Sequence, residues 1–105
     1  MSGAPGPPIA CDLSAIPAEA RPRHASLLRS LAAKTRERRE LGDGFAFRFD
    51  TDSGTLTELA EWIGLERRCC PFLRFTIDVE PGGGLWLRLT GDGGVKAFVG
   101  ETFAG

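Results

Sequence analysis

Two of the three cysteines of this chain are adjacent, and they stand directly before a proline: Cys69 and Cys70 precede Pro71. The third, Cys11, lies far earlier in the chain. Thiolate sulfurs suit soft ions such as mercuric ion, arsenite or cuprous ion. The residue before a proline is driven out of the α-helical region, so we expect Cys70 to lie where a helix turns into a strand. The sequence therefore predicts a soft-metal site at this junction, with Cys69 and Cys70 as ligands and Cys11 able to add a third sulfur.

Structural zinc fits this cysteine pattern less well. Zinc sites usually have four ligands from two spaced pairs such as C-x2-C. The chain has no such pair, and its one histidine is His24. A tetrahedral site would need Asp12, Glu66 or His24 to complete it, so we place Asp12 and Glu66 among the supporting residues.

Three arginines flank the adjacent cysteines: Arg67, Arg68 and Arg74. A close guanidinium shifts the pKa of an ionisable group by about one to three units toward its charged form. The carbonyl end of a helix disfavours a thiolate by about 0.3 to 1 kcal/mol. If any of these arginines faces the sulfurs, we expect it to prevail and to lower the pKa of the thiols.

Other interpretations of the cysteines stay open. Free cysteines are among the most often buried residue types, so the sulfurs could simply pack in the core. In a thiol enzyme, one cysteine would be the nucleophile and a neighbour would resolve it, for redox chemistry or for cleavage of a carbon-metal bond with Asp12 or Glu66 as proton donor. In a non-catalytic interaction domain, a homodimer would form at an open sheet edge or through Trp86. The sequence favours binding over catalysis without deciding between them.

Length and composition indicate one ordinary globular domain. The chain has 105 residues, of which 42% are hydrophobic and 26% are charged. A chain of this length buries enough surface to fold without disulfides or metal. Its formal net charge of -1 provides no field that would hold a nucleic acid.

The sequence predicts a cytoplasmic protein. No stretch is long and apolar enough to span a membrane, and residues 1–8 lack the features of a signal peptide. In a reducing compartment the cysteines are expected to be free thiols or metal ligands rather than a disulfide framework. Residues 1–8 are rich in Gly and Pro, which is typical of a disordered tail, and residues 9–105 are expected to form a single domain.

Hydrophobic periodicity predicts the secondary structure. Helices are expected at 14–41, 55–70 and 95–102, and strands at 9–13, 45–49, 73–79 and 85–89. The main part of the first helix is expected to begin near Pro22, because an interior proline removes a helical hydrogen bond, and Gly42 is expected to cap it. The order βαβαββα predicts an α+β fold, a single two-layer sandwich whose mixed sheet carries the helices on one face.

Several segments resemble a family of small, largely uncharacterised bacterial proteins. The resemblance rests on the early cysteine Cys11 and on residues 66–72, which read Glu-x-x-Cys-Cys-Pro-Phe, and it extends over about residues 9–103. The family is associated with heavy-metal resistance, especially to mercury. The resemblance therefore implies a metal-related role, with Cys11, Cys69 and Cys70 in the positions of the family's cysteines.

Overall fold

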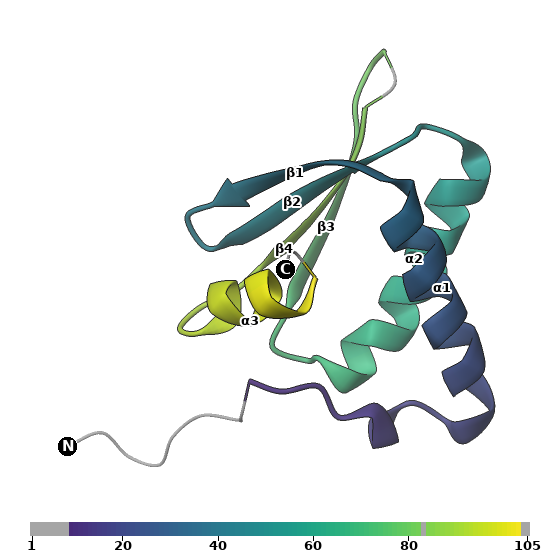
Figure 1. The fold of residues 1–105 in the computed structure, drawn as a ribbon, viewed down its shortest axis with the longest axis vertical. Helices are drawn as coiled ribbons and strands as arrows, with labels where there is room; N and C mark the ends of the chain where they lie inside the picture. The colour runs from purple at the N-terminus through teal and green to yellow at the C-terminus, as the bar shows by residue number, and fades with distance from the viewer. Residues whose placement is uncertain (1–8, 83, 104–105) are drawn as a thin grey trace.

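The computed structural model describes residues 9–82 and 84–103 and has an α+β fold of three helices and a four-stranded sheet (Figure 1). Two short 3-10 helices come first, η1 (Leu13–Ala15) and η2 (Ala18–Ala20). The other elements follow in the order α1 (Arg21–Lys34), β1 (Thr35–Leu41), β2 (Gly44–Phe49), α2 (Ser53–Cys69), β3 (Arg74–Val79), β4 (Leu85–Thr90) and α3 (Val95–Thr102). The tail expected at residues 1–8 lies outside the described residues.

All strand pairings of the described sheet are antiparallel, so the expected mixed sheet is wrong. The strand order is β1-β2-β4-β3, with β1 and β3 at the edges. Two hairpins, β1-β2 and β3-β4, meet where β2 pairs with β4. In the centre of the sheet, Leu87 of β4 lies opposite Phe47 on one side and Ile77 on the other. The helix α2 connects the two hairpins.

The strand expected at residues 9–13 is wrong. This segment has no pairing in the described sheet and leads into η1, where the carboxylate of Asp12 accepts a hydrogen bond from the backbone N–H of Ser14. Its alternating apolar residues Ile9 and Leu13 are 37% and 55% exposed, so the alternation does not mark a buried face. An Asp side chain that binds a nearby backbone N–H favours a turn over a strand.

The expected first helix is too long. α1 begins at Arg21, close to the predicted start, but it ends at Lys34, and the rest of the predicted helix is the edge strand β1. Gly42, expected as a helix cap, lies with Asp43 in the two-residue turn between β1 and β2. The observed element order therefore differs from the predicted one at two places, the missing first strand and the additional β1.

The charged residues of β1 explain why a helix was expected there. Arg, Glu and Lys are good helix formers, but pairing with β2 overrides this propensity. Ion pairs accompany the pairing: Arg36 reaches Asp50 at 2.6 Å, and Glu37 accepts from Arg48 at 3.3 Å. Charges along an edge strand also discourage pairing with a further chain.

The remaining elements lie where the sequence predicts them. α2 begins slightly earlier than expected, because Asp52 rather than Thr55 is the N-cap and its carboxylate accepts from both the N–H and the hydroxyl of Thr55. α2 ends at Cys69. Cys70 has a φ of -128° and a ψ of 65°, outside the α-helical region, as expected for the residue before Pro71. The helix-to-strand junction predicted at the adjacent cysteines is confirmed.

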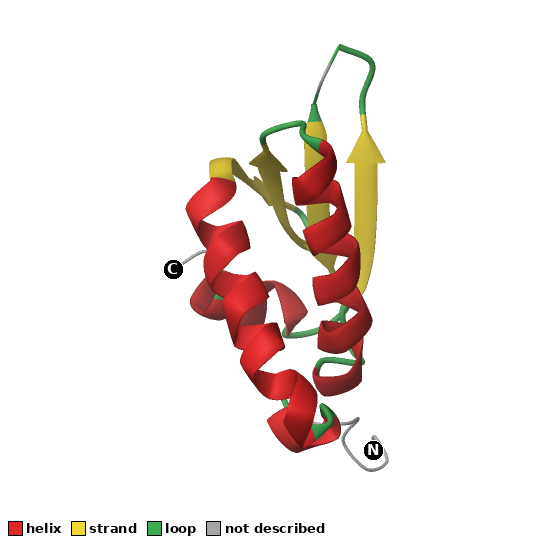
Figure 2. Ribbon diagram, turned by 90° about the vertical axis from the view of Figure 1, so that its right-hand side faces the viewer, coloured by secondary structure: helices red, strands yellow, loops and turns green. Residues whose placement is uncertain are grey.

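The core of the fold lies on one face of the central strands. Phe47 and Phe49 of β2 and Leu87 and Leu89 of β4 are each at most 5% exposed, and they face residues of all three helices. Figure 2 shows α1 and α2 side by side beside the sheet. Trp86 occupies the alternate position of β4, so it lies on the other face, as the sequence predicts. The complete two-layer sandwich stays a prediction.

Gly44 begins β2 where this strand approaches the backbone of β4. A Cβ atom there would overlap the carbonyl oxygen of Leu89, whereas one at Gly42 would meet no described atom within 4 Å beyond its chain neighbours. We expect Gly44→Ala to lower the free energy of unfolding by about 1 to 3 kcal/mol, the usual result of overpacking. Gly42→Ala should change it by less than about 0.5 kcal/mol. Urea denaturation measures both, and equal stabilities would contradict this contact.

Candidate functional site

The candidate site lies at the C-terminal end of α2. Trp62, Glu66 and Cys69 are buried at three- and four-residue spacing, which places them on the same side of the helix. Cys70 follows as the C-cap, and its backbone N–H donates to the carbonyl of Glu66 at 2.8 Å. Both adjacent cysteines are 0% exposed. The last turn of α2 therefore fixes two sulfurs inside the protein.

The carboxylate of Glu66 is the centre of the site. Glutamate is rarely buried, but this residue is only 2% exposed. Its Oε1 lies 2.5 Å from Nε2 of His24 in α1 and 3.5 Å from Sγ of Cys69. Its Oε2 lies 3.3 Å from Sγ of Cys70 and 3.9 Å from Sγ of Cys11. All three sulfurs and one imidazole thus surround a single buried carboxylate.

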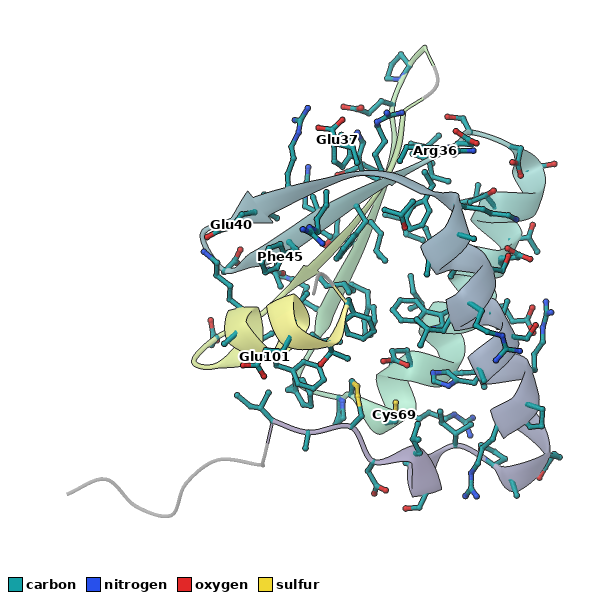
Figure 3. All side chains as sticks on the ribbon, in the orientation of Figure 1. Arg36, Glu37, Glu40, Phe45, Cys69 and Glu101 are labelled. Carbon is teal, nitrogen blue, oxygen red and sulfur yellow. A yellow bond between two sulfur atoms is a disulfide. The ribbon has the colours of Figure 1, made fainter. Side chains whose placement is uncertain are left out.

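The segment of residues 9–16, here called the N-terminal strap, closes the site. Cys11 forms a disulfide with Cys70, and their Cα atoms are 5.0 Å apart (Figure 3). The backbone N–H of Asp12 donates to the carbonyl of Cys69 at 3.0 Å. Cys69 keeps a free thiol. The expectation of free thiols or metal ligands rather than a disulfide is therefore wrong for Cys11 and Cys70 in this structure, because the strap folds back over the end of α2 instead of forming a strand.

Four donor atoms of this cluster are close enough to bind one metal ion. The sulfurs of Cys11, Cys69 and Cys70 and a carboxylate oxygen of Glu66 all lie within 4.8 Å of one another. The sulfurs of Cys69 and Cys70 are 3.7 Å apart. Two ligands of a tetrahedral ion are separated by about 3.8 Å when the metal–sulfur distances are about 2.3 Å. Opening the disulfide would supply the two further thiolates that such an ion needs.

The three arginines expected to favour a thiolate do not do so at Cys69. Arg67, Arg68 and Arg74 are all exposed. Burial, followed by the charge of Glu66 and its hydrogen bond to the thiol, raises the pKa of Cys69 to about 12. The condition for a lowered pKa, an arginine that faces the sulfur, is therefore not met at this thiol. Its sulfur is buried, whereas Arg67 and Arg68 at the end of α2 and Arg74 in β3 are exposed.

The two carboxylates predicted to support the site have different positions. Glu66 lies inside the cluster, in contact with every sulfur. Asp12 is exposed, and its carboxylate caps η1 by accepting from Ser14. Only the backbone of Asp12 takes part in closing the site.

His24, considered in the sequence only as a residue that could complete a zinc site, lies against Glu66. It is 7% exposed and lies on the buried side of α1 with Leu27 and Leu31. The three- and seven-residue spacing of these residues was the available signal, since it places the ring on the core side of α1. Nothing in the local sequence indicates that the partner of this ring is Glu66.

Comparisons with known proteins give no information about function, so the functional conclusion is based on the site itself. No protein-family model, curated protein or solved structure matches the chain. Among the helices of the described residues, none combines the length and the apolar character that crossing a membrane requires.

The contribution of the buried pair can be measured against an exposed pair that joins the same two helices. Arg23 of α1 donates to Glu61 of α2 at 2.7 Å, and their side chains are 50% and 42% exposed. We expect His24→Leu to lower the free energy of unfolding by about 3 to 5 kcal/mol, because it removes a partner from the buried carboxylate of Glu66. Arg23→Leu should lower it by less than about 1 kcal/mol. If chemical denaturation gave similar small losses of unfolding free energy for His24→Leu and Arg23→Leu, the burial of Glu66 would not depend on its contact with His24.

The raised pKa of Cys69 predicts a loss of stability at alkaline pH. Below about pH 8.5 the thiol is protonated in both the folded and the unfolded chain, so it contributes no pH dependence. Above that pH only the unfolded chain releases the proton, until the folded pKa of about 12 is reached. Between pH 7.5 and 9.5, the disulfide-bonded protein should lose about 1 kcal/mol more stability than its Cys69→Ser variant.

Denaturation curves at several pH values measure this difference, and other titrating groups cancel in the comparison of the two proteins. Mass spectrometry of peptides after each measurement verifies that the Cys11–Cys70 disulfide has not exchanged. Parallel pH profiles of the parent protein and Cys69→Ser would contradict a raised pKa.

Proposed function

We propose that the reduced protein binds one soft metal or metalloid ion through the thiolates of Cys11, Cys69 and Cys70. The observation that carries this conclusion is the gathering of all three sulfurs with the Glu66 carboxylate within 4.8 Å of one another. These residues come from two segments far apart in the sequence. Three thiolates form a donor set that suits mercuric ion, arsenite or cuprous ion, and the carboxylate adds one harder ligand.

The oxidation state of Cys11 and Cys70 controls this site in our proposal. In the disulfide form only Cys69 keeps a thiol, so the protein lacks the three thiolates that a soft ion would need. A cellular thiol such as glutathione, itself oxidised to its disulfide, would reduce the Cys11–Cys70 bond and restore both cysteines as ligands. A cytoplasmic location, as the sequence predicts, would favour this reduced form.

The supporting residues have separate tasks in this proposal. The carboxylate of Glu66, which contacts the sulfurs, adds a negative charge that attracts the cation. His24 holds Oε1 of Glu66 at 2.5 Å and so orients its second oxygen toward Cys70 and Cys11. Partners that orient a ligand typically change metal affinity by about 10- to 100-fold when they are removed.

Mercuric ion is the ligand to test first, because residues 66–72 resemble the motif associated with mercury resistance. A physical reason also supports it. A soft ion is suited to the three sulfurs of this site, whereas structural zinc usually has four ligands at regular spacing. We propose a role in binding or buffering such an ion in the cell.

Thiol–disulfide exchange is the second candidate function. It is favoured by one observation, the 3.7 Å contact between the free sulfur of Cys69 and the disulfide sulfur of Cys70. The thiolate is the attacking species in such an exchange, and the pKa of Cys69 is raised to about 12, so the attacking form is scarce near neutral pH. Metal binding also needs the Cys69 thiolate, but there the bound cation itself displaces the proton, so metal binding is the better supported function.

Titration of the reduced protein with mercuric chloride tests the proposed function. A large excess of glutathione should be present, because any single thiol binds mercuric ion and the competitor removes it from isolated thiols. We expect the anaerobically reduced protein to retain one mercuric ion per chain, measured by elemental analysis after gel filtration. The Cys69→Ser variant should lose it to glutathione.

A matched pair of variants tests the carboxylate. Glu66→Gln should weaken binding by about tenfold or more, whereas Glu61→Gln, on the exposed side of the same helix, should leave it unchanged. Metal retention by Cys69→Ser equal to that of the parent protein would contradict a three-sulfur site. Equal loss in both glutamate variants would remove Glu66 from the site.

A further inference from the structure

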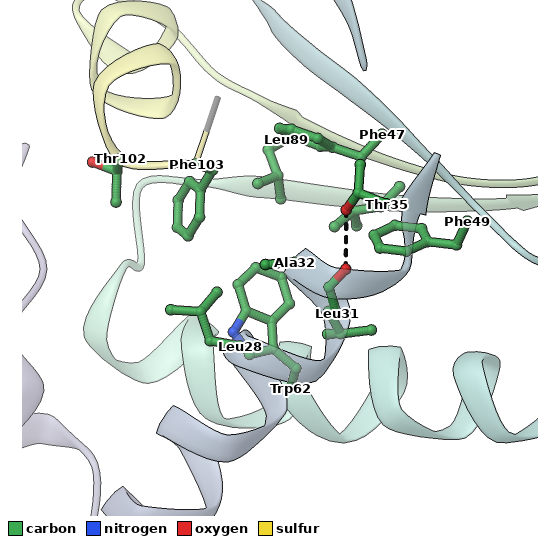
Figure 4. A pocket seen from close by; sticks show the side chains of 11 residues that line it. Leu28, Leu31, Ala32, Thr35, Phe47, Phe49, Trp62, Leu89, Thr102 and Phe103 are labelled. Carbon is green, nitrogen blue, oxygen red and sulfur yellow. Dashed lines mark hydrogen bonds between the residues drawn. The ribbon is translucent and has the colours of Figure 1, made fainter. Parts of the chain in front are cut away.

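A cavity separate from the cysteines lies between the three helices and the sheet (Figure 4). Its volume is about 290 Å³. It is a pocket open to solvent on one side, since its lining residues Leu28, Ala32 and Thr102 are exposed while Phe47, Phe49 and Leu89 lie in the core. Small-molecule sites usually measure about 300 to 1,000 Å³, and this cavity lies at the lower end of that range.

The walls of the cavity are almost entirely apolar. Aliphatic and aromatic side chains of α1, β2 and β4 form most of them, and no charged side chain is among them. The hydroxyl of Thr35 is already used, because it donates to the carbonyl of Leu31 at 3.0 Å. A charged molecule would lose its hydration here without gaining a partner, so the walls select an uncharged one.

One polar atom of the wall has no partner. Trp62 is 2% exposed, and its indole Nε1 has no hydrogen-bond partner among the described residues. Figure 4 shows the indole ring among the wall residues, of which Leu28 is 37% exposed. A buried donor without an acceptor is costly, and a ligand that brings an acceptor would remove that cost.

We propose that this cavity binds a small, uncharged and mostly apolar molecule with one hydrogen-bond acceptor, such as an aliphatic ketone. The apolar part fills the space beneath the helices, and the oxygen accepts a hydrogen bond from Nε1 of Trp62. Because Nε1 is itself buried, a side chain of the wall has to move for the oxygen to reach it. This site does not depend on the state of the cysteines, since none of them lines the cavity.

A matched pair of ligands tests the proposal in the full-length protein. 2-Heptanone and hexanoate have the same chain, but one ends in a neutral methyl ketone and the other in a carboxylate. The chain has two tryptophans, so an ¹⁵N NMR spectrum contains two indole signals, and Trp86→Phe assigns the one that belongs to Trp62. We expect 2-heptanone to move the Trp62 indole proton downfield in a saturable titration and hexanoate to bind at least tenfold more weakly.

Two neighbouring alanines of α1 supply the control. Both are exposed, but only Ala32 lines the cavity. Ala32→Phe should fill the cavity and weaken the binding of 2-heptanone at least tenfold, and Ala33→Phe should change it less than twofold. The absence of a saturable Trp62 shift, equal binding of hexanoate, or equal effects of the two alanine variants would each overturn the proposal.

Discussion

The structure depends most on the burial of one carboxylate, that of Glu66, at the last turn of α2. A buried carboxylate is tolerated only when other groups replace the water that it loses. His24 of α1 supplies one such group at 2.5 Å, and the thiol of Cys69 supplies another at 3.5 Å. These contacts set the positions of α1 and α2 relative to each other at the end where the N-terminal strap closes over them. Burial, and then the charge of the same carboxylate, raises the pKa of the neighbouring thiol of Cys69.

The backbone geometry before Pro71 places two sulfurs beside this buried carboxylate and so forms a candidate metal centre. Because Cys70 must leave the helical conformation, its sulfur approaches Oε2 of Glu66 while that of Cys69 approaches Oε1. The strap then brings Cys11 to the same carboxylate, held by the backbone hydrogen bond from Asp12 to Cys69. Once a cellular thiol has reduced the disulfide, a cation placed among these atoms would displace the thiol protons and bind the resulting thiolates together with the carboxylate. In the proposed function, redox state and metal binding are thus coupled through Cys11 and Cys70.

Local patterns in the sequence were enough to locate the junction at Pro71, the helix α2, the β3-β4 hairpin and the helix α3. They failed where tertiary contacts decide the outcome. The charged run after Lys34 has helical propensity, but pairing with β2 makes it a strand. The segment around Cys11 alternates like a strand, but Asp12 turns it into η1, and no local signal tells that it returns to α2. The three cysteines were predicted as one group from their chemistry alone, whereas the contact of His24 with Glu66 depends on how two helices pack.

The number of sulfur atoms bound to the metal tests the central claim most directly. X-ray absorption spectroscopy of the reduced protein loaded with one equivalent of mercuric ion measures that number without any assumption about affinity. The arrangement of Cys11, Cys69 and Cys70 around Glu66 predicts three sulfur neighbours in the parent protein. In Cys69→Ser the number should fall to two. Two sulfur neighbours in both proteins would contradict the three-thiolate site and leave only Cys11 and Cys70 as ligands.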